Sequence, residues 1–195
     1  TNLSFCNAFI QNALRDPYTN EIGKTLVFCV SQKHALKITT ILNELAEKYF
    51  PNKFQSDFAI QVTSNVTNPD PQQMTIDFKN NNLRGNSPIN ELYKTSKARV
   101  CVTVGMMTTG YDCRDLLNIC LFRPVFSPTE FIQMKGRGTR IFDFKECWKD
   151  KNQIPKTINS IKSSFKLFDY FKNYQYFEEE FDYDEVLKLP AEGTG

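Results

Sequence analysis

The sequence predicts an α/β domain in three layers, with a mainly parallel sheet flanked by helices and an aromatic and acidic C-terminal extension. Short apolar runs, typical of strands buried on both faces, recur at residues 24–30, 58–63, 98–104, 118–124 and 165–170. Helical spacing of apolar residues separates most of these runs. Strands joined through helices cross over right-handed and pair in parallel, so the two observations together indicate the α/β class.

Helices are predicted where apolar residues recur at helical spacing between residues that begin or end helices, at 1–21, 31–49, 68–79, 89–94 and from 127 onward. The first is expected to be a linker helix that leads into the domain. Ser31 is a good N-cap for the second helix. Ser127, Pro128 and Glu130 form a capping box with proline at the first helical position, which predicts a well-capped last helix.

Composition bounds the class of protein. The 195 residues fit one domain of ordinary size, and 41% hydrophobic and 24% charged residues are typical of a globular protein. A net charge of +2 is too small to identify a nucleic-acid binder by bulk charge. Without a long apolar run or a leader, we expect no membrane partner and no secretion. Thr1 in place of Met suggests a fragment or a processed chain.

Spacing and residue type argue against several kinds of site. The six cysteines form no C-x-x-C pair, so we expect free thiols in a cytoplasmic protein. His34 is the only histidine, so a metal cluster or a histidine-based triad is poorly supported. Lys24 follows Gly23, but a phosphate-binding P-loop needs a glycine where Tyr18 stands and a helix after the lysine.

Polar residues follow the predicted strands at the carboxyl ends, where parallel sheets bind ligands. They are Ser31, Thr63, Ser64, Thr103 with the segment to Asp112, and Arg123. We expect them to form a single working edge. A hydroxyl at a strand end is also an ordinary turn residue, and the Ser31 turn equally fits a plain β–α connection, so both interpretations stay open.

An arginine-rich stretch follows the last predicted helix. Arg137 and Arg140 are three residues apart and share one face of a helix or tight turn, where each guanidinium group can grip phosphate oxygens. Gly136 has no Cβ and lets a phosphate or a second backbone approach closely. We expect both arginines to project from the working edge into a crevice that another lobe completes. The alternative is a basic helix end that makes surface salt bridges.

The pattern Gln-x-x-Gly-Arg-x-x-Arg at 133–140 resembles motif VI of superfamily 2 helicases and translocases, and residues 107–112 resemble their motif V. The form Gly-Arg-Gly-Thr-Arg, with a late Phe-Asp-Tyr strand at 168–170, is similar to the R (restriction, motor) subunit of type I restriction enzymes. The resemblance covers about residues 22–181. It implies the second of two RecA-like (P-loop NTPase-like) domains, with ATP and Mg²⁺ bound against a first domain that holds the P-loop and the metal ligands.

The resemblance also implies roles for individual residues. Arg137 and Arg140 would be arginine fingers on the γ-phosphate, with Gln133 near the attacking water. Three further residues would contact or accommodate the nucleotide, with Asp112 at the ribose: Gly110, Asp112 and Gly136. Four would contact the DNA backbone: Ser31, Thr63, Ser64 and Thr103. Thr109 stands where many relatives carry arginine, so it receives no role.

The implied partners are double-stranded DNA, a nuclease domain and a first RecA-like domain of the same protein, and separate modification and specificity subunits. The expected domains are a linker helix at 1–21, a RecA-like domain at 22–172 with an irregular excursion at 143–164, and the start of an extension at 173–195. Its aromatic residues either stack on bases or pack under the sheet or against a neighbouring domain. Two functional alternatives stay open: a repair-type superfamily 2 helicase, and a non-catalytic nucleic-acid-binding module.

Overall fold

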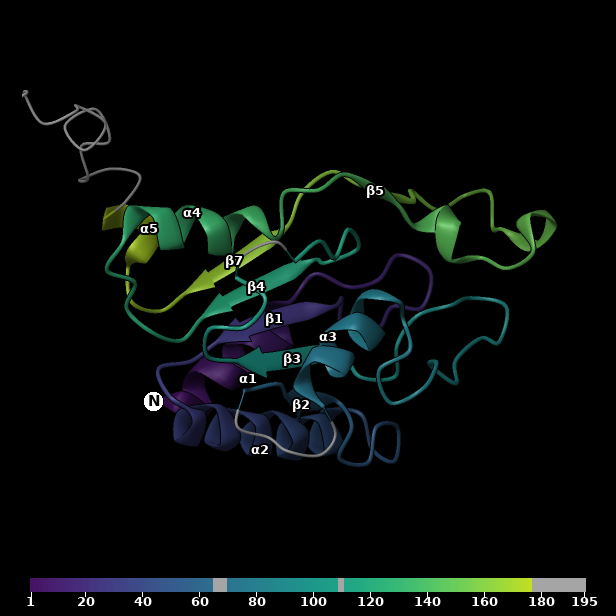
Figure 1. Cartoon of the computed structure of the whole chain (residues 1–195). Coiled ribbons are helices and arrows are strands. Elements are labelled where there is room, and N and C mark those ends of the chain that lie inside the picture. Colours follow the sequence, from purple (N-terminus) through teal and green to yellow (C-terminus); the bar gives the residue numbers. More distant parts are fainter. Residues whose placement is uncertain (65–69, 109–110, 177–195) are drawn as a thin grey trace, which may run out of the picture.

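A five-stranded parallel sheet forms the centre of the computed structural model, which describes residues 1–64, 70–108 and 111–176 (Figure 1). In spatial order its strands are β2 (Ala59–Gln61), β3 (Val100–Thr103), β1 (Thr25–Phe28), β4 (Asn118–Leu121) and β7 (Lys166–Asp169). Each neighbouring pair in this sheet runs parallel. The predicted α/β class with a mainly parallel sheet is therefore confirmed.

Helices cover both faces of the sheet. One face carries α1 (Asn2–Asn12) and α2 (Gln32–Tyr49), and the other carries α3 (Pro71–Lys79) and α4 (Pro128–Gly136). Successive strand residues point to opposite faces, so Val27 belongs to the first core and Leu26 to the second. Both side chains are fully buried. The central strand therefore reads as a continuous apolar run because both of its faces are covered.

The predicted helix starts are confirmed at the atomic level. The Ser31 hydroxyl accepts a hydrogen bond from the His34 amide at 3.1 Å, and the Ser127 hydroxyl accepts one from the Glu130 amide at 3.4 Å. Each bond satisfies an amide that would otherwise have no partner in the first turn. Helix α1, the segment expected to be a linker, buries Phe9 and packs against α2, so it adds to the core of the domain.

The excursion at 143–164 is an ordered lobe beyond the amino ends of the strands (Figure 1). It contains the antiparallel ribbon β5 (Phe142–Asp143) with β6 (Ile161–Lys162), and the short helices η1 (Phe144–Cys147) and η2 (Lys151–Gln153). Trp148 packs against Tyr93 with ring centroids 5.1 Å apart, which gives the lobe its own apolar cluster.

The short helix predicted at 89–94 is wrong, because this segment forms turns. Its backbone bonds to the lobe: the Lys94 amide donates to the Cys147 carbonyl at 2.7 Å, and the Lys149 amide donates to the Leu92 carbonyl at 2.7 Å. Two of the apolar residues that suggested a helix, Leu92 and Tyr93, instead pack in the Trp148 cluster. After β7 the chain makes one helical turn, α5 (Asn173–Gln175). Most of the expected aromatic and acidic extension, from 177 to 195, lies outside the described residues.

Candidate functional site

Helix α4 decides where the arginine-rich stretch lies. It begins after β4 leaves the carboxyl edge of the sheet and runs back over the face of the sheet (Figure 1). Its nine residues span about 13 Å. Gly138, just after the helix, lies against Phe165, which precedes the amino end of β7. The expectation that Arg137 and Arg140 project from the carboxyl edge is therefore wrong, because the helix carries them towards the opposite edge.

Both arginines contact the segment that resembles motif V. Nη1 of Arg137 donates to the carbonyl oxygen of Tyr111, while its Nε donates to the carbonyl oxygen of Gln133 at 3.0 Å. Nη1 of Arg140 lies 3.2 Å from Oδ2 of Asp112, and these two side chains are 53% and 42% exposed. The fold thus brings Gln133, Arg137, Arg140 and Asp112 together on a partly exposed surface. Gly110, predicted to act beside Asp112, lies outside the described residues.

The two glycines of this stretch have different surroundings. A Cβ on Gly136 would meet no atom of the described structure within 4 Å, so open space adjoins it. A Cβ on Gly138 would lie 2.4 Å from the ring of Phe165. Within the domain the close contact is therefore made at Gly138, by the Phe165 side chain, and the approach of a phosphate or a second backbone to Gly136 stays a prediction. The only sequence signal for it was the second glycine of Gly-Arg-Gly-Thr-Arg.

The hydroxyl residues at the carboxyl edge divide into exposed and buried pairs. Ser31 and Ser64 are exposed. Thr63 is buried, and Thr103 is fully buried at the end of β3. A side chain without solvent exposure cannot reach a DNA backbone, so the structure does not support the contacts predicted for Thr63 and Thr103. Arg123, also at this edge, is held against Glu130, and burial lowers the pKa of its guanidinium group.

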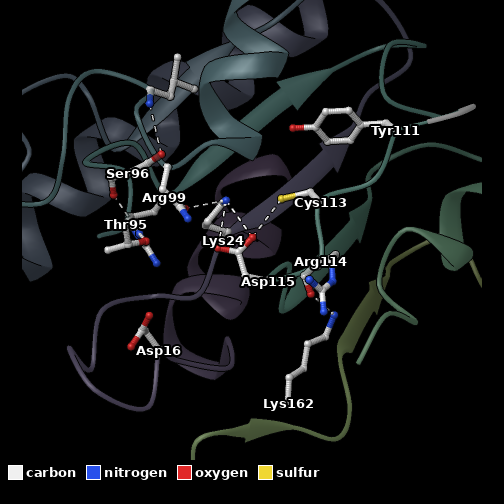
Figure 2. Close-up of polar contacts among 12 residues, drawn as sticks. Asp16, Lys24, Thr95, Ser96, Arg99, Tyr111, Cys113, Arg114, Asp115 and Lys162 are labelled. Carbon is white, nitrogen blue, oxygen red and sulfur yellow. Dashed lines mark hydrogen bonds and ion pairs between the residues drawn. The ribbon is translucent and has the colours of Figure 1, made fainter. Parts of the chain in front are cut away.

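A buried ion pair that sequence reasoning missed holds the segment that resembles motif V against the interior of the domain. Nζ of Lys24, just before β1, lies 2.9 Å from Oδ1 and 3.1 Å from Oδ2 of Asp115 (Figure 2). It also donates to Oδ1 of Asn81 at 2.9 Å, and Cys113 Sγ lies 3.3 Å from Asp115 Oδ1. The two charged side chains are 1% and 7% exposed. The pair therefore fixes the chain three residues beyond Asp112.

The charges of this pair stabilise each other against burial. Burial on its own lowers the pKa of Lys24, but the attraction of Asp115 outweighs it and the pKa is raised. For Asp115, burial raises the pKa, and the ammonium group of Lys24 outweighs burial so that the pKa is lowered. Both groups are therefore held in their charged forms. Lys24 follows a glycine, which drew attention to a P-loop, but its actual role is this internal contact.

The described ranges contain neither a candidate metal cluster nor a membrane-spanning helix. No group of three or more histidine, cysteine, aspartate or glutamate residues there could hold a metal ion. The helices of those ranges are all too short or too polar to cross a membrane. All six cysteines are free and buried.

Comparisons with known proteins agree with the motifs. No family model matches the chain. Over 168 residues it is 31% identical to the type I restriction enzyme EcoKI endonuclease subunit of Escherichia coli, which covers 86% of this chain and 12% of that subunit. A solved fragment described as an HsdR subunit of a type I restriction enzyme from Vibrio vulnificus matches with a TM-score of 0.59 and 27% identity, covering 90% of this chain and 27% of that one.

The fold also matches a separate helicase domain. The C-terminal domain of the DEAD-box protein Dbp5 aligns with a TM-score of 0.51 and 11% identity, covering 95% of this chain and 87% of that domain. At this identity the likeness concerns the fold alone. The chain spans only about an eighth of the length of the E. coli subunit that it resembles. The predicted resemblance is confirmed: type I restriction endonuclease subunits are among the relatives of this chain, and its fold matches RecA-like helicase C-terminal domains.

Proposed function

We propose that this chain is the second RecA-like motor domain of an ATP-dependent DNA translocase, the R subunit of a type I restriction endonuclease. The observation that supports this most is the contact between two motif-bearing segments. Arg137 bonds to the Tyr111 carbonyl and Arg140 pairs with Asp112 on one partly exposed surface. The type I restriction relatives supply the expected class of protein, a restriction endonuclease subunit. ATP as the energy source and DNA as the substrate follow from the resemblance to motifs V and VI.

In this proposal the arginines act on ATP bound between this domain and a first RecA-like domain. Arg137 and Arg140 exchange their present partners for γ-phosphate oxygens, and Gln133 orients the attacking water. Asp112, released from Arg140, is then free to bond the ribose, and the open space beside Gly136 admits the phosphates. Gly110 keeps its expected role in the turn before Asp112. Charge-assisted bonds from the arginines draw the two domains together, and hydrolysis weakens that attraction.

The metal ligands belong elsewhere in this proposal. Magnesium prefers carboxylate oxygens and water in an octahedral shell, and the described part of this chain offers no cluster of such ligands. The first RecA-like domain therefore supplies the Mg²⁺ site together with the P-loop. Turnover of ATP requires both domains, so the 195-residue chain on its own is expected to be inactive.

DNA contact is proposed at the other edge of the sheet. Ser31 and Ser64 follow the carboxyl ends of β1 and β2 as exposed hydroxyls, suited to bonds with backbone phosphates. Such contacts carry no sequence information, as a translocase requires. Thr63 and Thr103 support these turns from inside. Recognition of a DNA site is left to a specificity subunit, and the modification subunit and nuclease domain complete the proposed assembly.

The test is Arg137→Ala in the protein that carries both motor domains. DNA-stimulated ATP turnover is expected to fall by about 10³-fold or more, the effect of losing an arginine finger. Binding to duplex DNA without ATP is expected to stay within about twofold. Arg84→Ala, at an exposed turn far from the motifs, is the matched control and should retain turnover. Unchanged turnover in Arg137→Ala would refute the finger assignment.

A further inference from the structure

A small cavity lies between the two connecting segments that lead to and from the β5–β6 lobe. Its volume is about 310 Å³, and residues 138–141 and 162–165 line it. The first stretch contributes Arg140 and the second contributes Lys162, and no acidic residue is among the lining residues. Two of the lining residues are therefore basic, and the one carboxylate paired with them, Asp112 on Arg140, is not part of the lining.

Lys162 is unusual because it is buried without an ion-pair partner. It is 4% exposed, and its ammonium group donates to the carbonyl oxygen of Arg114 at 3.3 Å (Figure 2). Among the described residues no carboxylate lies within ion-pair distance of it. Asp115 is nearby, but both of its oxygens are taken by Lys24. An ammonium group has three donors, so Lys162 retains donors for another acceptor.

The surroundings leave this charge weakly stabilised. The pKa of Lys162 is lowered to about 8, mainly by burial; Arg140 also lowers it, while Cys113 and Asp115 act in the opposite direction. Lys162 is thus mostly charged at neutral pH but close to losing its proton. An anion in the cavity would favour the charged form.

We propose that Lys162 and Arg140 form an oxyanion subsite for a phosphate group of the nucleotide. The hydroxyl groups of Ser163 and Ser164, which also line the cavity, are further donors. This inference rests on the proposed function, in which Arg140 already acts on phosphate. The nucleotide is favoured over DNA because the exposed DNA-contact candidates, Ser31 and Ser64, lie at the opposite edge of the sheet.

The first test measures anion binding directly on the 195-residue chain. Inorganic sulfate is the probe, because it is a tetrahedral dianion whose charge is constant between pH 7 and 9, and binding is followed by NMR titration. Lys162→Met and Arg140→Met are each expected to weaken sulfate binding about tenfold at pH 7, the effect of losing one charged hydrogen bond. Lys156→Met, an exposed lysine of the same lobe, is the control and should bind as the wild type does.

The second test uses pH to separate binding from a purely structural role. Wild-type affinity for sulfate should fall between pH 7 and 9 as Lys162 loses its proton. Lys162→Arg keeps its charge over this range, so its affinity should stay constant. This variant also covers the case in which Lys162→Met fails to fold. Equal sulfate affinity for wild type and Lys162→Met, or a pH dependence that Lys162→Arg does not remove, would overturn the subsite.

The outcomes also separate this inference from the proposed function. Lys162-dependent sulfate binding together with unchanged ATP turnover in Arg137→Ala would leave the anion subsite standing and refute the arginine-finger role in the proposed function. Loss of turnover in Arg137→Ala with Lys162-independent sulfate binding would refute the subsite alone. In the two-domain protein, Lys162→Met should raise the KM for ATP and leave duplex DNA affinity unchanged. The reverse result would overturn the assignment to the nucleotide.

Discussion

Two ion pairs hold the short segment 111–115, one near each end, and they differ in how far they are exposed to solvent. Lys24–Asp115 is nearly inaccessible, at 1% and 7% exposure, while Arg140–Asp112 is 53% and 42% exposed. A buried pair cannot lose one partner without leaving a charge in a medium of low polarity. An exposed pair exchanges with water at little cost. The difference teaches that this segment is fixed at one end and free to change partners at the other.

The largest effect is expected from breaking the buried pair. Asp115→Asn keeps the shape of the side chain but leaves the ammonium group of Lys24 unpaired, so the free energy of unfolding should fall by about 3–5 kcal/mol. Urea denaturation of the 195-residue chain measures it. The double variant Lys24→Met/Asp115→Leu removes both charges and should recover most of the loss. A double variant no more stable than Asp115→Asn would show that the charges themselves are needed.

The stability that the Lys24–Asp115 pair contributes should also depend on pH. The lowered pKa of Asp115 gives stability that is present above its unfolded pKa of about 3.9 and is lost as pH falls through the folded value. The raised pKa of Lys24 gives stability that is present below about 10.4 and is lost as pH rises through the folded value. The advantage of wild type over the uncharged double variant should therefore shrink at pH 3 and at pH 11. A stability difference between wild type and the double variant that does not change with pH would contradict this prediction.

A smaller effect should show how the arginine stretch is held. Gly138→Ala puts a methyl group 2.4 Å from the Phe165 ring, so we expect a loss of about 1–3 kcal/mol from overpacking. Gly136→Ala, two residues earlier at a helix end with open space, should be neutral or stabilising by up to about 1 kcal/mol. Thermal unfolding of the two variants gives the comparison. Equal losses would mean that Phe165 gives way and that packing does not position this turn.

The smallest effect is expected at the exposed pair. Asp112→Asn should change the free energy of unfolding by no more than about 1 kcal/mol, because water replaces the lost contact. The change should shrink further in 0.5 M salt, which screens exposed charges. Urea denaturation at two salt concentrations measures both. A loss as large as that of Asp115→Asn would remove the distinction between a fixed and an exchangeable end.

Much of the fold could be predicted because its signals are local. Ser31 and Ser127 mark helix starts by residue type, and the central strand is apolar on both faces, so periodicity and capping suffice. The segment 89–94 failed because its apolar spacing serves a lobe that is distant in sequence. No local pattern distinguishes a turn packed on Trp148 from a short helix.

The candidate site was predictable in its members but not in its placement. The motif pattern identified Arg137, Arg140 and Asp112, and the structure brings them together. Which edge they occupy depends on the direction in which α4 crosses the sheet, and which threonines are buried depends on their neighbours across β2 and β3. Lys24 and Asp115 meet across 91 residues of sequence, a contact that a single sequence does not reveal.

The connection from β3 to β4 begins at Thr103, on the rim proposed to meet DNA, and ends at Asn118, on the opposite rim. Tyr111 and Asp112, the partners of the two arginines, belong to this same covalent stretch. Loss of either arginine contact would therefore loosen a backbone segment that begins at Thr103. The proposed ATP hydrolysis at one edge of the sheet and the proposed DNA binding at the other would then be coupled directly, because one continuous segment of backbone connects the two edges.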